Sequence, residues 1–173
     1  MSGHSKWSTI KHKKAATDAH KGKVFTKLAS QISIAVRTGG GDPNGNPSLR
    51  LLIDKARSVN MPSDNVRRAI DRGLGKGGAG PVEEITYEGY GVGGVGVMVS
   101  VVTDNRNRTG AEIRQIFEHH GGSISGPGSV AYMKNITPVP TISLGGEEKT
   151  RVEQLLTALD DHIDVIHVWS NKA

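Results

Sequence analysis

Apolar residues in the first part of the chain recur every three or four positions, as on one face of a helix. Such a stripe runs from about residue 18 to residue 38, and the glycines at residues 39–41 end it. Residues 1–16, in contrast, have little apolar content beyond Trp7 and Ile10 and no sustained period. We predict a basic arm there, flexible when free, which would reach about 50 Å when fully extended at roughly 3.3 Å per residue.

Two shorter helices are predicted next. Asn46 followed by Pro47 supplies an N-cap and a first-turn proline for the first of them. The other covers residues 63–72 and ends at Gly73, a residue suited to a left-handed cap. With the preceding helix they form a predicted bundle over residues 17–73. Its apolar stripes consist of Phe25, Leu28, Ile32, Ala35, Val36, Leu49, Leu52, Ile53, Ala56, Val66, Ala69 and Ile70.

The pattern changes from helical to alternating after a glycine-rich linker at residues 74–81. Runs of β-branched and aromatic residues at 85–88 and 95–102 are separated by a glycine-rich turn, which predicts a hairpin. Further strands are predicted at residues 129–133, 141–144 and 163–169.

Two helices are predicted between these strands. Thr109 and Glu112 have the spacing of a capping box, and apolar residues between positions 152 and 159 recur at helical spacing. The resulting order, β-β-α-β-β-α-β, is typical of an α+β domain over residues 82–173, with the helices on one face of a mostly antiparallel sheet. The predicted fold class is therefore α+β, with an N-terminal three-helix basic domain that carries the flexible arm.

Charge is distributed unevenly between the two parts. Residues 1–76 hold 15 Lys and Arg and 5 Asp and Glu, a net charge of +10, whereas residues 77–173 hold 7 and 12, a net charge of −5. Few acids alternate with the bases of the helices, whose apolar stripes already account for the buried faces. This pattern favours a polyanion bound through its phosphates, with little base reading, over a solvated charged face.

The candidate nucleic-acid-binding residues lie on the arm, on the helices and in one polar turn. In that turn, Arg106 and Arg108 either hold a phosphate or a carboxylate beside the N–H groups of the following helix, or belong to a solvated connection that caps it. Trp7 either stacks on an exposed base or pins the arm to the bundle. The candidates are His4, Lys6, Trp7, Lys11, His12, Lys13, Lys14, Lys21, Lys23, Lys27, Arg50, Lys55, Arg57, Arg67, Arg68, Arg72, Arg106 and Arg108.

No constellation for catalysis, a metal or a cofactor is visible in the sequence. The absence of Cys excludes disulfides, thiolate zinc sites and Cys nucleophiles. Matches to G-x-G-x-x-G at residues 73–78 and 91–96 lack the strand-then-helix context of a dinucleotide site, so tight turns account for them. His119 and His120 point about 100° apart on a helix, which favours a surface pair over a metal site.

The hydropathy of the chain indicates where in the cell the protein is expected. No apolar run approaches the roughly 18 residues of a membrane-spanning helix, and residues 1–6 lack the apolar stretch of a signal peptide. We expect a soluble, cytoplasmic protein, with no membrane partner, and a monomer in preference to an oligomer.

Seven sequence blocks carry a family resemblance. They are GHSKW at residues 3–7, IKHKK at 10–14, GGGDP at 39–43, NMP at 60–62, YEGYG at 87–91, TDNRNRT at 103–109 and GSVAY at 128–132. In these blocks, over most of its length, the chain resembles the YebC/PmpR family. The resemblance implies a non-catalytic, mostly cytoplasmic regulator of gene expression, described in bacteria as a probable DNA-binding transcriptional regulator. Relatives activate mitochondrial translation or are linked to ribosomes stalled at proline runs.

The chain departs from the family pattern in one place. Members usually carry a third domain, inserted after the strand that follows GSVAY and before a returning β-α-β segment. Here residues 133–136 pass directly into residues 137–140, where the returning segment begins. The insert is therefore expected to be missing near residues 133–137.

The sequence is compatible with more than one kind of binding partner. DNA and structured RNA, including the ribosome, are both expected; the arm, the linker and a phosphate-binding face suit the recognition of RNA shape slightly more than groove reading. An enzyme acting on RNA would need paired carboxylates or a metal site, which the sequence does not show. A protein-interaction module would use the acidic domain.

Overall fold

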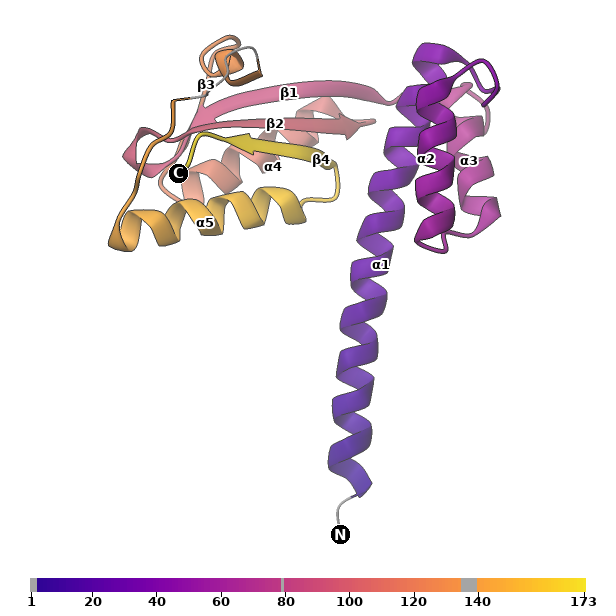
Figure 1. Cartoon of the computed structure of the whole chain (residues 1–173), viewed down its shortest axis with the longest axis horizontal. Helices are drawn as coiled ribbons and strands as arrows, with labels where there is room; N and C mark the ends of the chain where they lie inside the picture. The colour runs from indigo at the N-terminus through magenta and orange to yellow at the C-terminus, as the bar shows by residue number, and fades with distance from the viewer. Residues whose placement is uncertain (1–2, 79, 135–139) are drawn as a thin grey trace. The chain divides into compact units, whose positions relative to one another are not determined.

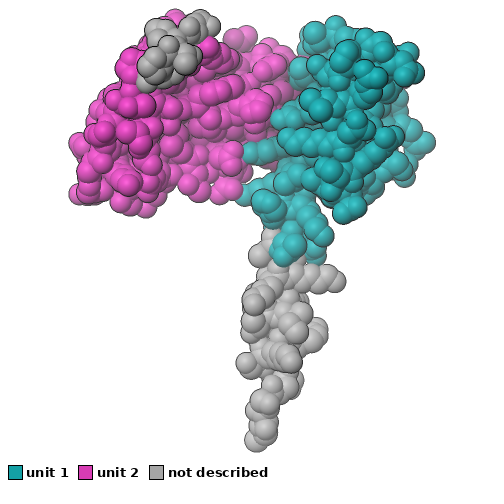
Figure 2. Space-filling view, viewed as in Figure 1, with its two compact units in different colours: residues 1–74 teal, residues 75–173 magenta. Residues whose placement is uncertain are grey.

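The computed structural model describes residues 3–78, 80–134 and 140–173, and for residues 3–16 this description covers the backbone. The chain divides into two compact units, residues 1–74 and residues 75–173, which are coloured separately in Figure 2. We call them unit 1 and unit 2. The division falls at one end of the glycine-rich stretch in which the sequence predicts a linker.

Unit 1 is helical. It consists of α1 (Gly3–Gly39), α2 (Pro47–Ser58) and α3 (Ser63–Gly73). α1 has 37 residues, whereas α2 has 12 and α3 has 11, so the N-terminal part of α1 extends beyond both (Figure 1). Despite this length, neither α1 nor another helix in the described part of the chain is long and apolar enough to cross a membrane.

The predicted N-cap of α2 is confirmed. Asn46 Oδ1 accepts a hydrogen bond from the Leu49 N–H at 3.1 Å, as expected of a capping amide. Asn46 Nδ2 donates to the carbonyl oxygens of Ala35 at 2.8 Å and Gly40 at 2.9 Å. One buried side chain therefore holds the end of α1 and the start of α2 together.

The predicted boundary between an irregular arm and the first helix is wrong. α1 begins at Gly3 and continues without a break to Gly39, so residues 3–16 have helical backbone. These residues include several Lys and Ala, which are good helix formers, and no Pro. A helix that has already nucleated extends with little further cost. An apolar stripe is needed to pack a helix against a neighbour, not to form it.

The predicted apolar stripes of unit 1 pack into one core, in which Leu28, Ile32, Val36, Leu49, Ala56, Met61 and Ala69 are buried. α1 and α3 approach closely near their C-terminal ends. A Cβ atom added to Gly73 would lie 2.6 Å from the Ser33 carbonyl oxygen and 2.7 Å from Val36 Cβ. The buried Ser33 hydroxyl also bonds the Ala69 carbonyl oxygen at 2.8 Å. Gly73 thus permits a contact that any larger residue would force open.

Unit 2 is an α+β layer, with α4 and α5 on one face of an antiparallel sheet (Figure 1). The strand order is β3-β1-β2-β4, and β1 pairs with β2 from Glu83 opposite Thr103 to Tyr90 opposite Gly96, which is the predicted hairpin. The elements are β1 (Glu83–Tyr90), η1 (Val92–Gly94), β2 (Gly96–Thr103), α4 (Arg106–His119), β3 (Ser123–Ser125), η2 (Ala131–Lys134), α5 (Gly146–Asp161) and β4 (Val165–Ser170).

The core of unit 2 lies between the sheet and the two helices. Val97, Val99 and Val101 of β2 are fully buried and belong to the same cluster as Phe117 of α4 and Leu155 of α5. The predicted helix with apolar residues between positions 152 and 159 is confirmed as α5. Burial of this alternating and helical apolar surface is the main stabilising contribution expected in unit 2.

Two predicted strands do not form within the described residues. Residues 131–134 form the short 3-10 helix η2, and residues 141–144 contribute an isolated parallel bridge between Ile142 and Lys172. β3 was not predicted, because three residues are too few to display an alternating pattern. The observed order is therefore β-β-α-β-α-β. The position expected for the missing insert lies largely outside the described residues.

Glu88 provides the physical reason for the lost strand near Val130. The residue is 8 % exposed, and its carboxylate accepts hydrogen bonds from the N–H groups of Gly128 at 2.8 Å and Val130 at 2.7 Å. Burial alone raises the pKa of Glu88, but these N–H groups, with that of Ala131 and the Ser129 hydroxyl, place the pKa below its ordinary value. Backbone N–H groups that bond a carboxylate are not available to a sheet ladder.

Candidate nucleic-acid interface

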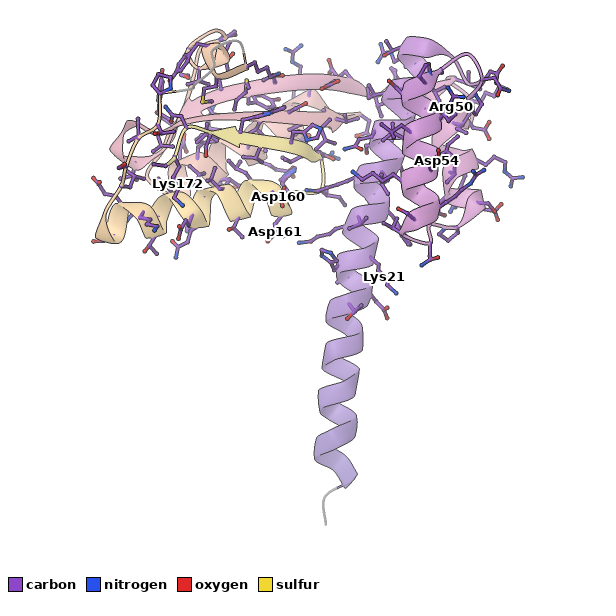
Figure 3. All side chains as sticks on the ribbon, in the orientation of Figure 1. Lys21, Arg50, Asp54, Asp160, Asp161 and Lys172 are labelled. Atoms are coloured by element: carbon purple, nitrogen blue, oxygen red, sulfur yellow. The ribbon has the colours of Figure 1, made fainter. Side chains whose placement is uncertain are left out.

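Unit 1 carries its basic side chains on the outside of its helices. Lys21 and Lys23 of α1 and Arg50, Lys55 and Arg57 of α2 are exposed, and Lys21 and Arg50 are marked on their helices in Figure 3. On α3, Arg67 and Arg68 are exposed, whereas Arg72, like Lys27 of α1, is half-buried. The side chains of His4, Lys6, Trp7, Lys11, His12, Lys13 and Lys14 lie outside the described residues.

Two clefts flank α3 and divide its arginines between them. A cleft of about 270 Å³ between α1 and α3 is lined in part by Arg68 and Arg72. A second, of about 260 Å³ between α2 and α3, is lined in part by Arg57 and Arg67. This division follows from helix geometry, because residues four apart share a face and adjacent residues differ by about 100°.

The arginines of the second cleft are paired with acids, but in exposed positions. Arg67 Nη2 lies 3.2 Å from Asp64 Oδ1, with side chains 73 % and 75 % exposed, and Arg57 Nη1 lies 3.4 Å from Asp54 Oδ1. Arg68 Nη2 instead donates to the neutral amide oxygen of Asn65. Exposed ion pairs of this kind are typically worth only about 0–1 kcal/mol. Water or a phosphate can therefore take the place of the acid in these pairs at little cost in free energy.

The polar turn of unit 2 is built differently from what the sequence predicts. α4 begins at Arg106 and its N-cap is Asn105, whose Oδ1 accepts from the Arg108 N–H at 3.1 Å. The capping-box interpretation of Thr109 was therefore wrong. Thr109 is fully buried one turn into the helix; its hydroxyl donates to Asp164 Oδ2 at 2.7 Å and accepts from the Thr103 hydroxyl at 2.8 Å.

Arg108 is held by a carboxylate of the chain itself. Its Nη2 lies 2.8 Å from Asp164 Oδ2, and its guanidinium is also within 3.6 Å of Asp104 and 3.9 Å of Glu112. The hydrogen bond to Asp164 and the charge of that carboxylate raise the pKa of Arg108. Of the two ligands considered from sequence, phosphate and carboxylate, the structure thus supplies an internal carboxylate to Arg108, whereas Arg106 remains exposed.

Glu112, His162 and Asp164 each offer a ligand atom within 4.8 Å of the others, the spacing of a metal site. Their geometry shows an internal hydrogen-bond network. His162 Nδ1 accepts from the Asp164 N–H at 3.2 Å, so its proton lies on Nε2, which donates to Glu112 Oε2 at 2.9 Å. A metal ion would have to displace or approach the Arg108 cation. These residues fit a structural role better than a metal centre.

His119 and His120 lie at the end of α4, with His119 exposed and His120 half-buried. Their rings are edge to face, with centroids 5.1 Å apart. Burial, together with the neighbouring His119, lowers the pKa of His120. Both histidines line a pocket of about 520 Å³ with His162 and Ile163.

Sequence reasoning missed the cleft between α1 and α3 and the Asp164 network. Phe25, which lines the cleft, was assigned to a buried apolar stripe. Asp164 lies at the start of the strand predicted at residues 163–169 and is 55 residues from Thr109, its hydrogen-bond partner. Nothing local in the sequence marks such a pairing.

The fold defines the class to which the chain belongs: an α+β protein with a separate, cationic helical unit. Two family models match it. The model of the TACO1/YebC protein N-terminal domain covers residues 5–76, and that of the TACO1/YebC second and third domain covers residues 82–135. The chain belongs to the TACO1/YebC family, as its sequence blocks indicate.

Relatives in other organisms agree with this assignment. A probable transcriptional regulatory protein of Rubrobacter xylanophilus is 53 % identical over 171 residues, covering 96 % of this chain and 68 % of the relative. One from Desulfitobacterium hafniense is 57 % identical over 133 residues, covering 77 % and 53 %. A third, from Burkholderia thailandensis, is 51 % identical over 158 residues, covering 91 % and 65 %. The chain thus spans about half to two thirds of the length of these relatives.

A solved structure shares the fold. The crystal structure of a conserved hypothetical protein from Aquifex aeolicus superimposes with a TM-score of 0.83 at 32 % identity, covering 90 % of this chain and 91 % of that one. The absence of the family insert from this chain stays a prediction.

Proposed function

We propose that the chain is a non-catalytic, nucleic-acid-binding regulator of gene expression, in which unit 1 binds the phosphate backbone. The observation that carries the proposal is the set of exposed cations on α1, α2 and α3, two of which, Arg57 and Arg67, form only exposed ion pairs. Such side chains exchange a weak ion pair for a phosphate and release condensed counterions from the nucleic acid. The name probable transcriptional regulatory protein, carried by the relatives, supports a regulatory role.

The nucleic acid proposed first is DNA, with transcription as the regulated step. Structured RNA, as on the ribosome, is the second candidate. One feature of α3 favours RNA: its arginines border clefts with apolar walls. A helix that reads a major groove presents polar side chains to base edges instead. A monomer acting in the cytoplasm, without a cofactor, is part of the proposal.

Charge reversal at matched positions in the full-length chain tests this function. Arg50→Glu changes an exposed arginine of unit 1, and Arg114→Glu makes the same change on an exposed position of α4. We expect Arg50→Glu to weaken binding of both duplex DNA and RNA. The slope of log affinity against log salt concentration should fall in magnitude by about 1, as for the loss of one phosphate contact. Arg114→Glu should change neither quantity. Equal effects of the two substitutions would remove unit 1 as the binding surface.

A further inference from the structure

The cleft between α1 and α3 has a defined shape. α1 and α3 run parallel, since Ser33 contacts Ala69 while Phe25 and Asn65 border the same cleft nearer the helix starts. The close approach at Gly73 holds the helices together at one end. Toward Phe25 they leave a hollow of about 270 Å³. This volume lies near the lower end of the range of small-ligand pockets, roughly 300–1,000 Å³.

The walls of this cleft combine an aromatic ring with cations and neutral polar groups. Phe25 and Met61 contribute apolar surface, Arg68 and Arg72 contribute positive charge, and Thr26 and Asn65 contribute neutral groups that form hydrogen bonds. The ten described residues that line it include no carboxylate. Arg68 is also oriented by its hydrogen bond to Asn65. A ligand with a flat ring and an attached anion fits this arrangement.

The cleft on the other side of α3 serves as an internal comparison. It has nearly the same volume and also two arginines, but its apolar wall consists of aliphatic residues such as Ile53, Val66 and Ile70. Its arginines face Asp54 and Asp64. It therefore lacks an aromatic face for a base, and both of its arginines lie beside a carboxylate.

We infer that the α1/α3 cleft binds a single unpaired nucleotide, with its base against Phe25 and its phosphate at Arg68. The inference rests on the proposed nucleic-acid binding and adds a substrate feature to it: a bulged, looped or flipped-out base within an otherwise paired backbone. Paired bases are stacked on both faces and cannot enter the cleft, whereas an unpaired base stacks on an aromatic side chain in RNA recognition. The exposed cations elsewhere on unit 1 bind the flanking phosphates.

The test compares a duplex that carries a single-nucleotide bulge with the same duplex without the bulge. Each duplex is made in RNA and in DNA, which shows which nucleic acid supplies the unpaired nucleotide. Stacking of one base on an aromatic side chain is worth roughly 1–3 kcal/mol, so the full-length chain should bind the bulged duplex about tenfold more tightly. Phe25→Leu keeps an apolar side chain but removes the aromatic face. It should abolish the preference for the bulge and leave the affinity for the paired duplex unchanged. Ile53→Leu, in the other cleft, should alter neither.

A second variant guards against misfolding of Phe25→Leu. Thr26→Gln places a longer neutral side chain at the exposed border of the cleft and should also reduce the preference for the bulge. Equal binding of bulged and paired duplexes by the unmodified chain, or a bulge preference that survives both Phe25→Leu and Thr26→Gln, would overturn the inference while leaving phosphate binding in place. If the unmodified chain bound none of the duplexes, the proposed function itself would be overturned.

Discussion

Arginines near the start of a helix form different kinds of ion pair in the two units. In unit 1, Arg67 follows the start of α3 and forms an ion pair with Asp64 in which both side chains are about three-quarters exposed. In unit 2, Arg108 follows the start of α4 and bonds Asp164, whose side chain is only 14 % exposed and also accepts from the buried Thr109. The first pair costs little to separate, whereas the second is part of the packing.

The comparison shows that position on a helix does not decide whether a cation can bind a ligand. Ligand binding depends on whether the guanidinium is already paired with a partly buried acid from a distant segment. Asp164 reaches Arg108 because β4 lies beside β2, and β2 leads directly into the turn before α4. Unit 1 has short connections between its helices, and the acids that pair with Arg57 and Arg67 are three residues away on the same helix.

The largest expected effect concerns the packing that shapes the cleft of unit 1. In Gly73→Ala, the new Cβ would meet the Ser33 carbonyl and Val36 at less than 3 Å, so we expect a loss of about 3 kcal/mol in the free energy of unfolding. Gly22→Ala is the control, because a Cβ at that helical position meets nothing within 4 Å and should stabilise the helix by up to about 1 kcal/mol. Urea unfolding measures both. Equal stability of the two variants would contradict the close α1–α3 contact.

The comparison of the two ion pairs is tested by removing their acids. Asp164→Ala removes the carboxylate that accepts from the buried Thr109 hydroxyl and from Arg108, so we expect a loss of about 2 kcal/mol in stability. Asp64→Ala removes the exposed partner of Arg67 and should cost less than about 1 kcal/mol. Thermal unfolding of both variants provides the measurement. A larger loss for Asp64→Ala would reverse the comparison.

Glu88 gives unit 2 a stability that depends on pH. Because the pKa of Glu88 in the folded chain lies below its ordinary value of 4.5, its contribution is complete above that value and is lost as pH falls through the folded pKa. Glu88→Gln should therefore reduce stability by about 1.5 kcal/mol at neutral pH, and by less as the solution is acidified below pH 4.5. Unfolding curves over this range test the sign. A difference that grows on acidification would refute it.

The exposed arginine at the border of the cleft provides a smaller, functional effect. Arg68→Glu reverses a charge beside the proposed phosphate position, and we expect affinity to fall about fivefold to tenfold for every nucleic-acid sequence alike. Arg106→Glu, at an exposed position of unit 2, is the matched comparison and should have less effect. Fluorescence anisotropy with several duplex sequences measures both. Loss of affinity for some sequences only would indicate base reading.

The smallest effect is expected from a conservative change at the same position. Arg68→Lys keeps the charge, so binding through a phosphate should change by no more than about twofold. If Arg68 reads a guanine in a major groove, Lys loses the bidentate contact and discrimination at one base pair falls by roughly 1–3 kcal/mol. Affinities for duplexes that differ at single positions separate the two. A changed base preference with an unchanged salt slope would show that Arg68 reads base edges, as in operator binding.

Local signals in the sequence predicted much of the fold. The cap at Asn46, the stripes of α1 to α3 and α5, and the β1–β2 hairpin depend on residues close together in the chain, so their patterns are visible without a structure. The prediction at residues 129–133 failed because competing bonds come from a distant segment, and the one at residues 141–144 failed because that segment forms a single bridge. Glu88 takes the N–H groups near Val130, and Ile142 meets a single bridge partner, Lys172.

The candidate site was predictable in charge but not in shape. The excess of Lys and Arg in residues 1–76 identified the helices that expose cations. The cleft beside α3 depends on how closely two helices approach at Gly73, which composition cannot express. Arg108 illustrates the same limit, since its partner Asp164 is 56 residues away.

The strand order β3-β1-β2-β4 also implies an order of events during folding. β1 and β2 are neighbours in sequence, but β4 joins β2 only after α4, β3 and α5 have been passed along the chain. Contacts between distant segments form more slowly than local ones. The helices of unit 1 meet across short connections, so their cationic surface is expected to exist while the sheet of unit 2 is still incomplete.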